Sequence, residues 1–328
     1  MERSRIVSGA VSVALLSAAC GGVAEAPRQD AGGDEPAVEL AGSLSSEEAA
    51  DAAEGVNAFG FELHRAVAEP EENTVTSPLS ASALLAMVAA GAGGSTAEEM
   101  VEVLRLEGPR DDRYAALLAD LTDQSDVTLS IANSLWAAEG YPFEDEYLTF
   151  VQDTFGASLD EVDLGAPETA DRIDDWVDEQ TEGLIEDIAD DLELPDPQAV
   201  LVLLNAVYFL GTWTTTFDED DTRDAPFQLA DGTEVEVPTM HRSDPELDTA
   251  TGDGFTMARL PYGDDERFGM EVLLPDEEGT EAAAVTGGVM VESAGPPPLE
   301  VDRPFAFTVS DRQTGTILFL GSVHDPRS

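Results

Sequence analysis

The chain has 328 residues and a mass of 34.7 kDa, and 42% of its residues are hydrophobic, which suffices for one large domain or two small ones with a sizeable core. It carries 69 acidic residues against 15 basic ones, a formal net charge of −54, and every basic residue is an arginine. Such an acidic surface repels phosphate, so nucleic-acid binding through a basic face and attraction to anionic lipid are excluded. Because the acid is spread along the whole chain, it indicates a solvating surface; a metal-binding or partner-binding acidic face is the alternative.

The N-terminus has the pattern of an export signal. Arg3 and Arg5 precede the apolar residues 6–16, a stretch too short to span a bilayer as a mature helix. Residues 1–19 are therefore predicted to be a signal peptide. Small residues before a lone cysteine are typical of the bacterial lipoprotein cleavage box, so Cys20 is predicted to become a lipidated N-terminus. We expect an exported protein, either a membrane-anchored lipoprotein or an extracellular or periplasmic one. An ordinary secretory signal with an incidental cysteine is the alternative.

The single cysteine and the composition of the segment after the signal peptide limit how the rest of the chain can be organised. One cysteine excludes an intrachain disulfide and a cysteine-built zinc site. Residues 20–46 are mostly Gly, Ala, Pro and acid, which predicts a disordered acidic tether. The folded domain is predicted to cover residues 47–326 and contains no internal repeat.

Helices are predicted for the first part of the domain. A first helix is marked by Val56, Phe59, Phe61, Leu63 and Val67. Residues 79–90 are apolar or small on all sides, as in a helix buried inside a large domain, and the glycines of 91–94 end it. Residues 95–99 hold two overlapping capping-box patterns, which predict a helix that packs through Met100, Val103 and Leu104. A later helix is expected to present one apolar face: Ile173, Trp176, Val177, Leu184 and Ile188.

Strands are predicted mainly for the second part. Alternating residues over 127–136 predict a half-buried strand, and the apolar run 199–210 predicts a central strand covered on both faces. The remaining strands are expected at 227–229 and 235–237, joined by Asp231-Gly232 in a hairpin, at 255–260, at 268–274, and in a terminal hairpin of 305–309 and 317–323. Helices first and strands later predict an α+β fold.

Enzyme motifs are missing from the sequence. The three histidines, His64, His241 and His324, share no metal-ligand spacing, and we interpret them as surface or helix-side residues. The sequence has no Gly-x-Ser-x-Gly elbow and no phosphate loop, because the glycines of 91–94 follow a helix instead of a strand. We therefore predict that the chain is not an enzyme and needs no cofactor or metal.

One segment differs from ordinary core or loop. In the segment 277–288, alternate positions from 280 onward carry only small side chains, namely Thr280, Ala282, Ala284, Thr286 and Gly288. A strand with one small face can slide beneath covering helices, and the glycines let the segment exist first as a loop. On composition alone, an exposed Ala/Gly-rich linker is the favoured interpretation.

Several separated blocks of this sequence resemble the serpin family. The blocks are residues 73–100, 129–136, 173–185, 203–213, 277–284 and 304–321, and the whole resemblance extends over about 56–326. The block 203–213 reads Leu-Leu-Asn-Ala-Val-Tyr-Phe-Leu-Gly-Thr-Trp, and 277–284 is similar to the hinge motif of the family almost letter for letter. Leu184 departs from the pattern, since it stands where the family motif has Lys.

The resemblance implies a suicide inhibitor of serine proteases that acts as a monomer. Its reactive loop would be residues 277–298, and after cleavage the hinge side would insert as a strand into the main sheet. The implied hinge consists of Glu277, Gly279, Thr280, Glu281, Ala282, Ala283 and Ala284. The implied sheet-opening region consists of Ser77, Pro78, Ser80, Asn205 and Trp213.

The family loop length places the cleaved bond at Ser293–Ala294, or one residue earlier at Glu292–Ser293. Ser293 at the specificity position suits an elastase-like or subtilisin-like protease, and Glu292 suits an acid-tolerant pocket. A trypsin-like target is disfavoured because no arginine lies between Arg267 and Arg303.

The chain departs from the family before the reactive loop. Pro275 and Asp276 lead directly into Glu277, where the family has further helices and main-sheet strands, so about a quarter of the usual core is missing. Two explanations compete: a deletion that leaves a damaged sheet, or recruitment of residues 268–274 as a substitute lead-in strand. A truncated, non-inhibitory surface protein that binds a partner or is merely cut remains the alternative function.

Overall fold

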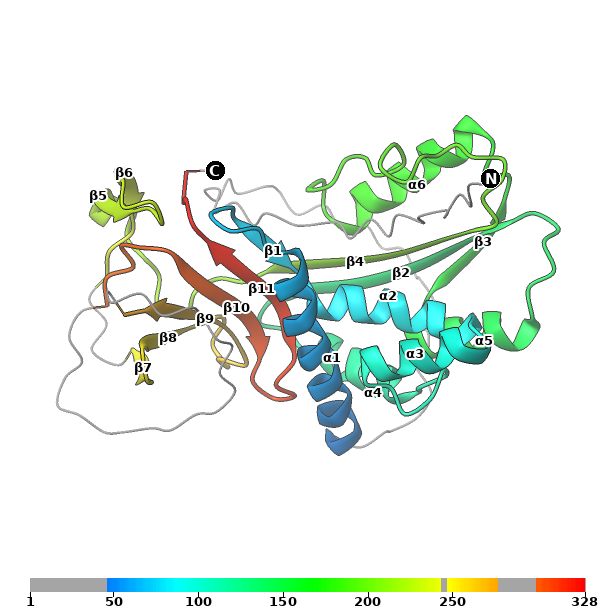
Figure 1. The fold of residues 1–328 in the computed structure, drawn as a ribbon, viewed down its shortest axis with the longest axis horizontal. Helices are drawn as coiled ribbons and strands as arrows, with labels where there is room; N and C mark the ends of the chain where they lie inside the picture. Colours follow the sequence, from blue (N-terminus) through cyan, green and yellow to red (C-terminus); the bar gives the residue numbers. More distant parts are fainter. Residues whose placement is uncertain (1–45, 243–246, 277–298, 328) are drawn as a thin grey trace, which may run out of the picture.

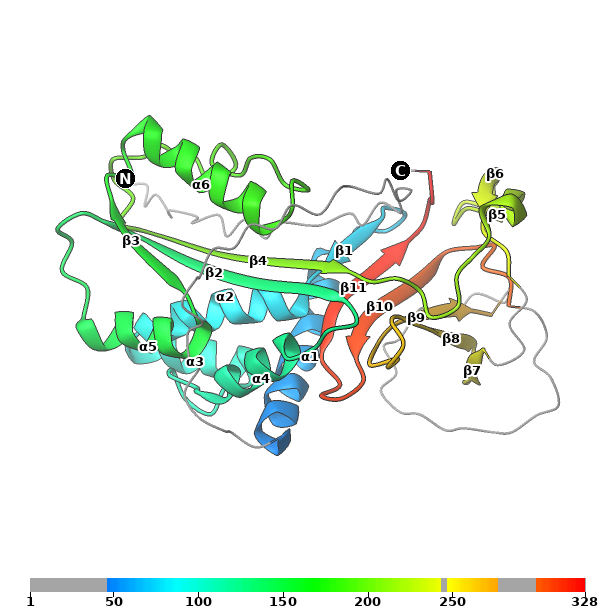
Figure 2. The same ribbon diagram turned by 180° about the vertical axis from the view of Figure 1, so that it is seen from behind.

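The computed structural model describes residues 46–242, 247–276 and 299–327. Within these ranges the chain forms six α-helices, one short 3-10 helix and eleven strands in three sheets (Figures 1 and 2). Most helices precede most strands, which confirms the predicted α+β class. None of the helices in these ranges is long and apolar enough to cross a membrane.

The largest sheet contains six antiparallel strands in the order β1-β11-β10-β9-β8-β7. Their bounds are β1 (Thr74–Thr76), β7 (Asp248–Thr251), β8 (Phe255–Pro261), β9 (Phe268–Pro275), β10 (Phe305–Asp311) and β11 (Ile317–Val323). The β8, β9, β10 and β11 strands confirm the sequence predictions. The short β1 comes from the other end of the chain and closes one edge by pairing with β11.

A second sheet contains β2 (Thr128–Ala138), β3 (Ser158–Val162) and β4 (Leu201–Leu210) in the order β3-β2-β4. The β2 strand pairs parallel with β3 and antiparallel with β4, and this register places Asn133 opposite Asn205. The third sheet is the predicted hairpin of β5 (Arg223–Gln228) and β6 (Glu234–Thr239), which follows the 3-10 helix Glu219–Asp221.

Helices cover both faces of the three-stranded sheet (Figure 1). They are α1 (Ser46–Val67), α2 (Pro78–Gly91), α3 (Gly94–Leu104), α4 (Arg113–Thr122), α5 (Asp145–Phe155) and α6 (Pro167–Gln180). Val207 of β4 belongs to the large core beneath the sheet, which also includes α1, α2, α4 and α5, while Leu204 belongs to a smaller core under α6. Successive side chains of a strand alternate between the two faces, so β4 contributes to both cores.

Two predicted helices differ in detail from the structure. The capping boxes of 95–99 do not form, because α3 already begins at Gly94, its N-cap is Gly93, and no side chain caps it. Val103 on this helix is exposed rather than packed. The helix α6 ends at Gln180, since the backbone reverses through positive φ angles at Glu182 and Gly183. Leu184 therefore lies outside the apolar face, with 62% of its surface exposed.

The β4 strand is not the central strand that its apolar run predicts. Among the strands that the structure describes, only β2 pairs with β4, so its second edge carries no ladder. A continuous apolar run indicates that both faces are covered, and this is correct here, but the run carries no information about the two edges.

Recruitment of residues 268–274 as a lead-in strand to this sheet is also wrong. These residues form β9, which pairs with β8 on one side and β10 on the other. Both edges of β9 are therefore occupied within the six-stranded sheet, and neither is available to the three-stranded sheet.

The close approach of α1 to α2 leads to a first prediction about stability. A Cβ atom added at Gly60 in α1 would lie 2.3 Å from the Cβ atom of Pro78 in α2. We expect Gly60→Ala to lower the free energy of unfolding by about 1–3 kcal/mol despite the better helix propensity of alanine, because α1 must move away from α2. The matched control is Gly55→Ala, whose Cβ would lie 3.3 Å from the Cβ atom of Arg105, a contact that a shift of a few tenths of an ångström relieves. Equal stability of both variants in urea unfolding would show that the contact relaxes without cost.

Candidate functional site at the free edge of β4

A small cavity lies at the unpaired edge of β4. It encloses about 20 Å³, which is room for one water molecule. Its lining comes from both sides of the sheet: Ser77, Ser80, Val177, Thr181, Ile185, Ile188 and residues 204–207. Residues above and below one strand can meet in a single cavity only around an edge of that strand. The cavity therefore marks the place where a further strand would pair with β4.

Ser77 begins the helix below this edge. It is the N-cap of α2, and its Oγ accepts a hydrogen bond from the backbone N–H of Ser80 at 3.2 Å. The same hydroxyl donates to the carbonyl of Leu318 in β11 at 2.7 Å. One buried hydroxyl thus joins α2 to the six-stranded sheet, and it holds Ser80 against the edge of β4.

Asn205 lies on the edge strand with one unsatisfied atom. Its Nδ2 donates to Oδ1 of Asn133 at 2.7 Å, and Nδ2 of Asn133 donates to the carbonyl of Phe155 at 2.8 Å. Oδ1 of Asn205 is buried and has no hydrogen-bond partner among the described residues. A buried acceptor without a partner costs about 1–3 kcal/mol. The site is therefore prepared to accept one more donor.

Two polar side chains hold the segment that follows α6 above the edge of β4. The hydroxyl of Thr181 donates to the carbonyl of Val177 at 2.8 Å and accepts from the N–H of Ile185 at 3.0 Å. A carboxylate oxygen of Asp174 accepts from the N–H groups of Ile188 and Ala189 at 2.7 and 2.8 Å. These bonds place Ile185 and Ile188 over β4 after α6 has ended.

Two residues of the predicted sheet-opening region lie elsewhere. Pro78 is the first residue of α2 and contacts Gly60 of α1. Trp213 lies beyond the end of β4, where its ring stacks on Tyr262 with centroids 4.2 Å apart and 15° between the ring planes. Only Ser77, Ser80 and Asn205 of the five predicted residues line the cavity. Pro78 and Trp213 do not line it, and a role of the five residues in sheet opening stays a prediction.

The two stems of the predicted reactive loop are held together. In the β9–β10 register, Pro304 would stand opposite Pro275, and a proline has no N–H to donate. Nε of Arg303 instead donates to the carbonyl of Pro275 at 2.8 Å, and Nη1 of Arg303 lies 2.6 Å from Oδ1 of Asp302. The last described residues before the loop and the first after it are thus anchored at one end of the six-stranded sheet.

The other predicted site residues lie outside the described residues. This applies to the signal peptide, Cys20, most of the tether, the hinge 277–284, and the candidate bonds at Glu292, Ser293 and Ala294. Within the described ranges, no group of three or more His, Cys, Asp or Glu side chains could hold a metal ion.

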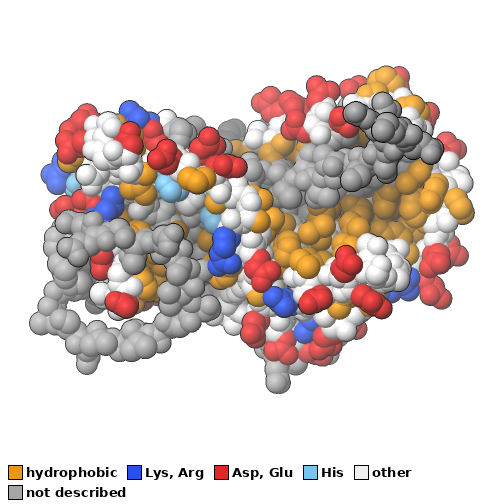
Figure 3. Space-filling model, viewed as in Figure 1, with side chains coloured by type: hydrophobic (Ala, Val, Ile, Leu, Met, Phe, Trp, Pro, Cys, Tyr) orange, Lys and Arg blue, Asp and Glu red, His pale blue; other side chains and the backbone are white. Residues whose placement is uncertain are grey.

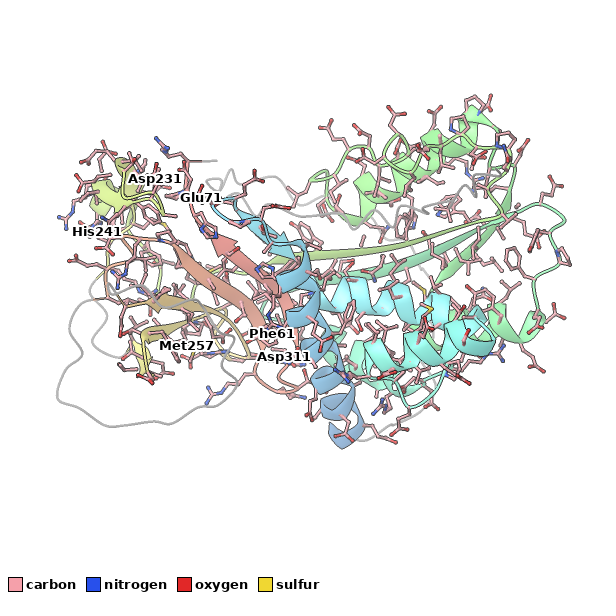
Figure 4. All side chains as sticks on the ribbon, viewed as in Figure 1. Phe61, Glu71, Asp231, His241, Met257 and Asp311 are labelled. Atoms are coloured by element: carbon pink, nitrogen blue, oxygen red, sulfur yellow. The ribbon has the colours of Figure 1, made fainter. Side chains whose placement is uncertain are left out.

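The histidines have structural surroundings. Nδ1 of His64 lies 3.2 Å from the Thr76 hydroxyl, and burial lowers the pKa of His64. His241 lies with Nδ1 2.9 Å from the Thr239 carbonyl oxygen, and Figure 4 shows it beside the β5–β6 hairpin, at the opposite end of the molecule from α6. These contacts agree with the interpretation of both residues as structural.

Sequence reasoning missed Asn133 and Asp174 as site residues. Asn133 is the one amide in a strand of apolar and small hydroxyl residues, and an amide in such a strand is a signal for a buried hydrogen bond. Asp174 carries no comparable signal, because α6 has five other acidic residues.

Comparisons with known proteins identify the family. A family model described as serpin (serine protease inhibitor) matches residues 54–278 and 276–326. An uncharacterized serpin-like protein of Thermococcus kodakarensis is 30% identical over 370 aligned positions, which cover 83% of this chain and 85% of the relative. Serpin-Z10 of Arabidopsis thaliana is 28% identical, with 77% of this chain and 92% of the relative covered.

Solved structures share the fold. Arabidopsis AtSerpin1 in its native stressed conformation has a TM-score of 0.69 and 22% identity, and the match covers 88% of this chain and 100% of that one. The thermophilic serpin Tengpin in its native state has a TM-score of 0.69 and 20% identity, with 87% and 95% covered. Fold and sequence agree, and the chain belongs to the serpin family.

Proposed function

We propose that this chain is an exported inhibitor of serine proteases that presents residues 277–298 as a cleavable loop. The observation that carries the proposal is the free edge of β4, bordered by a cavity and an unsatisfied Asn205 Oδ1, in a chain that also holds a hinge-like segment with one small face. A cut loop could pair along this edge while the protease is still bound as an acyl-enzyme. The protease would then be deformed before it can release itself.

The length of the cut loop is compatible with this pairing. The hinge side, residues 277–293, has 17 residues and starts beside Pro275, which stands opposite Phe255 at one end of β8. The β4 strand meets the six-stranded sheet near the other end of β8, through the Trp213–Tyr262 bridge. The seven residues of β8 span about 20 Å, and the three residues from the end of β4 to Trp213 span about 10 Å. To reach β4 from Pro275, the cut loop must span these two distances with about nine extended residues. About eight of its 17 residues then remain to pair with the ten residues of β4.

The segment missing before the loop would weaken the trap. Two observations support a real gap before the loop, in the sheet that contains β4. First, the family model matches in two pieces that meet at residues 276–278. Second, the alignment to the Thermococcus relative has 370 positions but covers only 83% of this chain, which is about 272 residues, so about 100 positions of the alignment have no counterpart here. An inserted strand would pair with β4 alone. It would form about half of the hydrogen bonds of a strand with two neighbours, each worth about 1 kcal/mol net.

If the chain is an inhibitor, it should form an SDS-resistant covalent complex with its target protease. We expect incubation with pancreatic elastase or subtilisin to give a band at the summed masses, and mass spectrometry to place the cut at Ser293–Ala294 or Glu292–Ser293. Trypsin serves as the matched control protease, since the loop contains no arginine. A first cut outside 291–295 would contradict the assignment of the loop. Quantitative cleavage within 291–295 without a complex would contradict inhibition but keep the loop assignment.

The second candidate function is a serpin-like surface protein that is cut without trapping the protease. The observation that favours it is the anchoring of β9, since both of its edges are paired and Arg303 holds Pro275. Here the hinge starts from β9, an anchored strand of the six-stranded sheet. Its path to β4 is longer than that of a hinge that starts from a strand next to β4. The complex assay above separates the two functions.

Export and lipidation form a separate part of the proposal. The lone cysteine after an apolar stretch and small residues supports a lipid anchor at Cys20. We expect Cys20→Ala to release the protein from the membrane fraction and to abolish incorporation of labelled palmitate. Unchanged palmitate incorporation would exclude Cys20 as the lipidated residue, whereas absence of label in both forms would indicate an ordinary secretory signal.

A further inference from the structure

Three aromatic rings form a row at the turn between β2 and α5. Tyr141 lies at the outer end with 48% of its surface exposed, and no other aromatic side chain in the described part of the chain is as exposed. Its ring centroid is 4.7 Å from that of Phe143, which in turn is 6.4 Å from that of the buried Tyr147. These three side chains, which we call the aromatic row, therefore lead from the core to solvent.

Backbone hydrogen bonds and a proline fix the turn that carries the row. The N–H of Tyr141 donates to the carbonyl of Ala138 at 3.0 Å, and the N–H of Phe143 donates to the carbonyl of Tyr141 at 2.9 Å. Gly140 makes the turn possible with a φ of 76°, and Pro142 restricts the backbone of Tyr141. An aromatic ring on such a fixed turn loses little conformational entropy on binding, which suits it as an anchor at a protein interface.

An open pocket of about 460 Å³ lies at the turn between α2 and α3. Its floor is apolar and its exposed rim acidic: Ala92, Ala97, Val101 and Pro109 below, Glu98 and Glu107 above. Arg110 connects this pocket to the aromatic row. Its Nε donates to the carbonyl of Ala90 at 3.3 Å, and its guanidinium lies 3.8 Å from Glu144 and 3.5 Å from Glu146 at the start of α5. The pocket and the row are therefore neighbours on one surface.

Charge decides what kind of partner fits this surface. Glu139 and Asp145 flank the exposed ring in the sequence, are exposed, and form no ion pair with a described residue. Figure 3 shows acidic side chains over α6 and over α3 and α5 at this end of the molecule, with hydrophobic side chains between them. A second copy of the chain, a nucleic acid or an anionic membrane would be repelled. A cation is attracted both by carboxylates and by the face of an aromatic ring.

We propose that the aromatic row and the adjoining pocket bind an arginine-rich segment of a partner protein. One guanidinium would stack on the ring of Tyr141, and the stem of a neighbouring arginine would lie on the pocket floor with its charged end at Glu98 and Glu107. Arginine is favoured over lysine, because its planar guanidinium can stack on a ring and donate hydrogen bonds to carboxylates at the same time.

This binding is separate from the proposed inhibition. The aromatic row lies at the opposite end of the molecule from the β5–β6 hairpin (Figure 1). That hairpin is close to one stem of the predicted reactive loop, since the N–H of Gln228 donates to the carbonyl of Asp302 at 2.7 Å. A partner on the aromatic row would therefore leave the loop accessible, and its binding requires neither a protease nor a cut.

The test uses the uncut full chain and three fluorescein-labelled peptides of about twelve residues. Each has a Gly-Ser background that carries four arginines, four lysines, or four citrullines, the uncharged analogue of arginine. By fluorescence anisotropy in about 150 mM salt, we expect the Arg peptide to bind about fivefold more tightly than the Lys peptide, and the citrulline peptide not to bind.

Variants separate stacking on the row from general attraction to an acidic protein. Tyr141→Ala leaves the net charge unchanged, yet it should weaken binding of the Arg peptide about fivefold and remove the preference over the Lys peptide. Tyr141→Phe keeps the ring and should retain the preference. The matched control Met240→Ala, at a position 45% exposed that follows β6, should change nothing.

Cross-linking locates the peptide. A benzophenone group at the centre of the Arg peptide should attach to residues 139–147 or 92–109. Cross-links confined to other parts of the chain, or no binding at all, would overturn the proposal. Equal binding of the Arg and Lys peptides together with an unaltered Tyr141→Ala variant would overturn it too, since binding would then be diffuse attraction to the acidic surface. Neither result bears on the protease assays, which do not involve this surface.

Discussion

Cleavage between Val291 and Gly295 should raise the melting temperature of the chain by about 10 °C. If the hinge side pairs with the free edge of β4, it forms about eight residues of ladder and covers the cavity at Ser77, Ser80 and Asn205. Each kcal/mol shifts the melting temperature by about 2–4 °C in a domain of this size, so a net gain of about 3 kcal/mol is sufficient. A serpin in which the inserted strand has two neighbours should gain more. Differential scanning calorimetry of cut and uncut protein measures the shift.

Two arginine substitutions test whether insertion causes this gain. Thr286→Arg would put a charge on the part of the small face that pairs with β4, and should abolish the shift, because burying an unpaired charge costs several kcal/mol. Glu281→Arg is the matched control, since residues 277–285 only connect β9 to β4 in this arrangement, and it should retain the shift. If cut and uncut wild-type proteins melt together, the loop does not insert and the chain is a substrate.

Replacement of Arg267 by Met should lower the free energy of unfolding by about 3–5 kcal/mol, the second large effect that we expect. Nε of Arg267 lies 2.7 Å from Oδ1 of Asp311, and its Nη2 lies 2.8 Å from Oδ2 of Asp120 on α4. The side chain of Asp311 is 0% exposed, and that of Arg267 is 11% exposed. Figure 4 shows Asp311 at the turn after β10, beside α1. Without Arg267, a buried carboxylate would lose its counter-charge.

The pKa of Asp311 determines how the effect of Arg267→Met on stability should change with pH. Burial alone would raise the pKa of Asp311, but hydrogen bonds from Arg267, Thr314 and backbone N–H groups outweigh it and lower the pKa. A lowered pKa stabilises the fold above the unfolded value of about 3.9, and this contribution is lost as pH falls through the folded value. The stability difference between wild type and Arg267→Met should therefore be largest near pH 7 and shrink below about pH 4.

Urea unfolding at several pH values checks both parts. The control is Arg105→Met, which removes an exposed ion pair with Glu62 whose two side chains are 49% and 52% exposed. We expect that change to cost less than about 1 kcal/mol at any pH. A difference for Arg267→Met that stays constant from pH 7 to pH 3 would mean that lost packing, and not the charge of Asp311, causes the destabilisation.

Local patterns were sufficient for elements whose shape depends on their own residues. The Asp231-Gly232 turn predicts the β5–β6 hairpin because its backbone must adopt positive φ, and the structure has φ 81° at Gly232. The apolar residues 79–90 predict α2 for a similar reason, since no side of that helix could face water at low cost. Two helices were missed although a signal existed: Tyr114, Leu117, Leu118 and Leu121 follow a helical spacing in α4, and α5 begins with acidic residues.

The sequence by itself determined the α+β class and the family resemblance, and that resemblance implied that Ser77, Ser80 and Asn205 lie in one region. Only the tertiary structure decided which edges are paired. Strand pairing depends on a partner that is distant in the chain, so neither the free edge of β4 nor the occupied edges of β9 could be deduced from their own residues. The three-residue β1 and the acidic β3 are strands only because β11 and β2 lie beside them. Likewise, α6 ends before Leu184 because the hydrogen bonds of Thr181 and Asp174 turn the chain back onto β4.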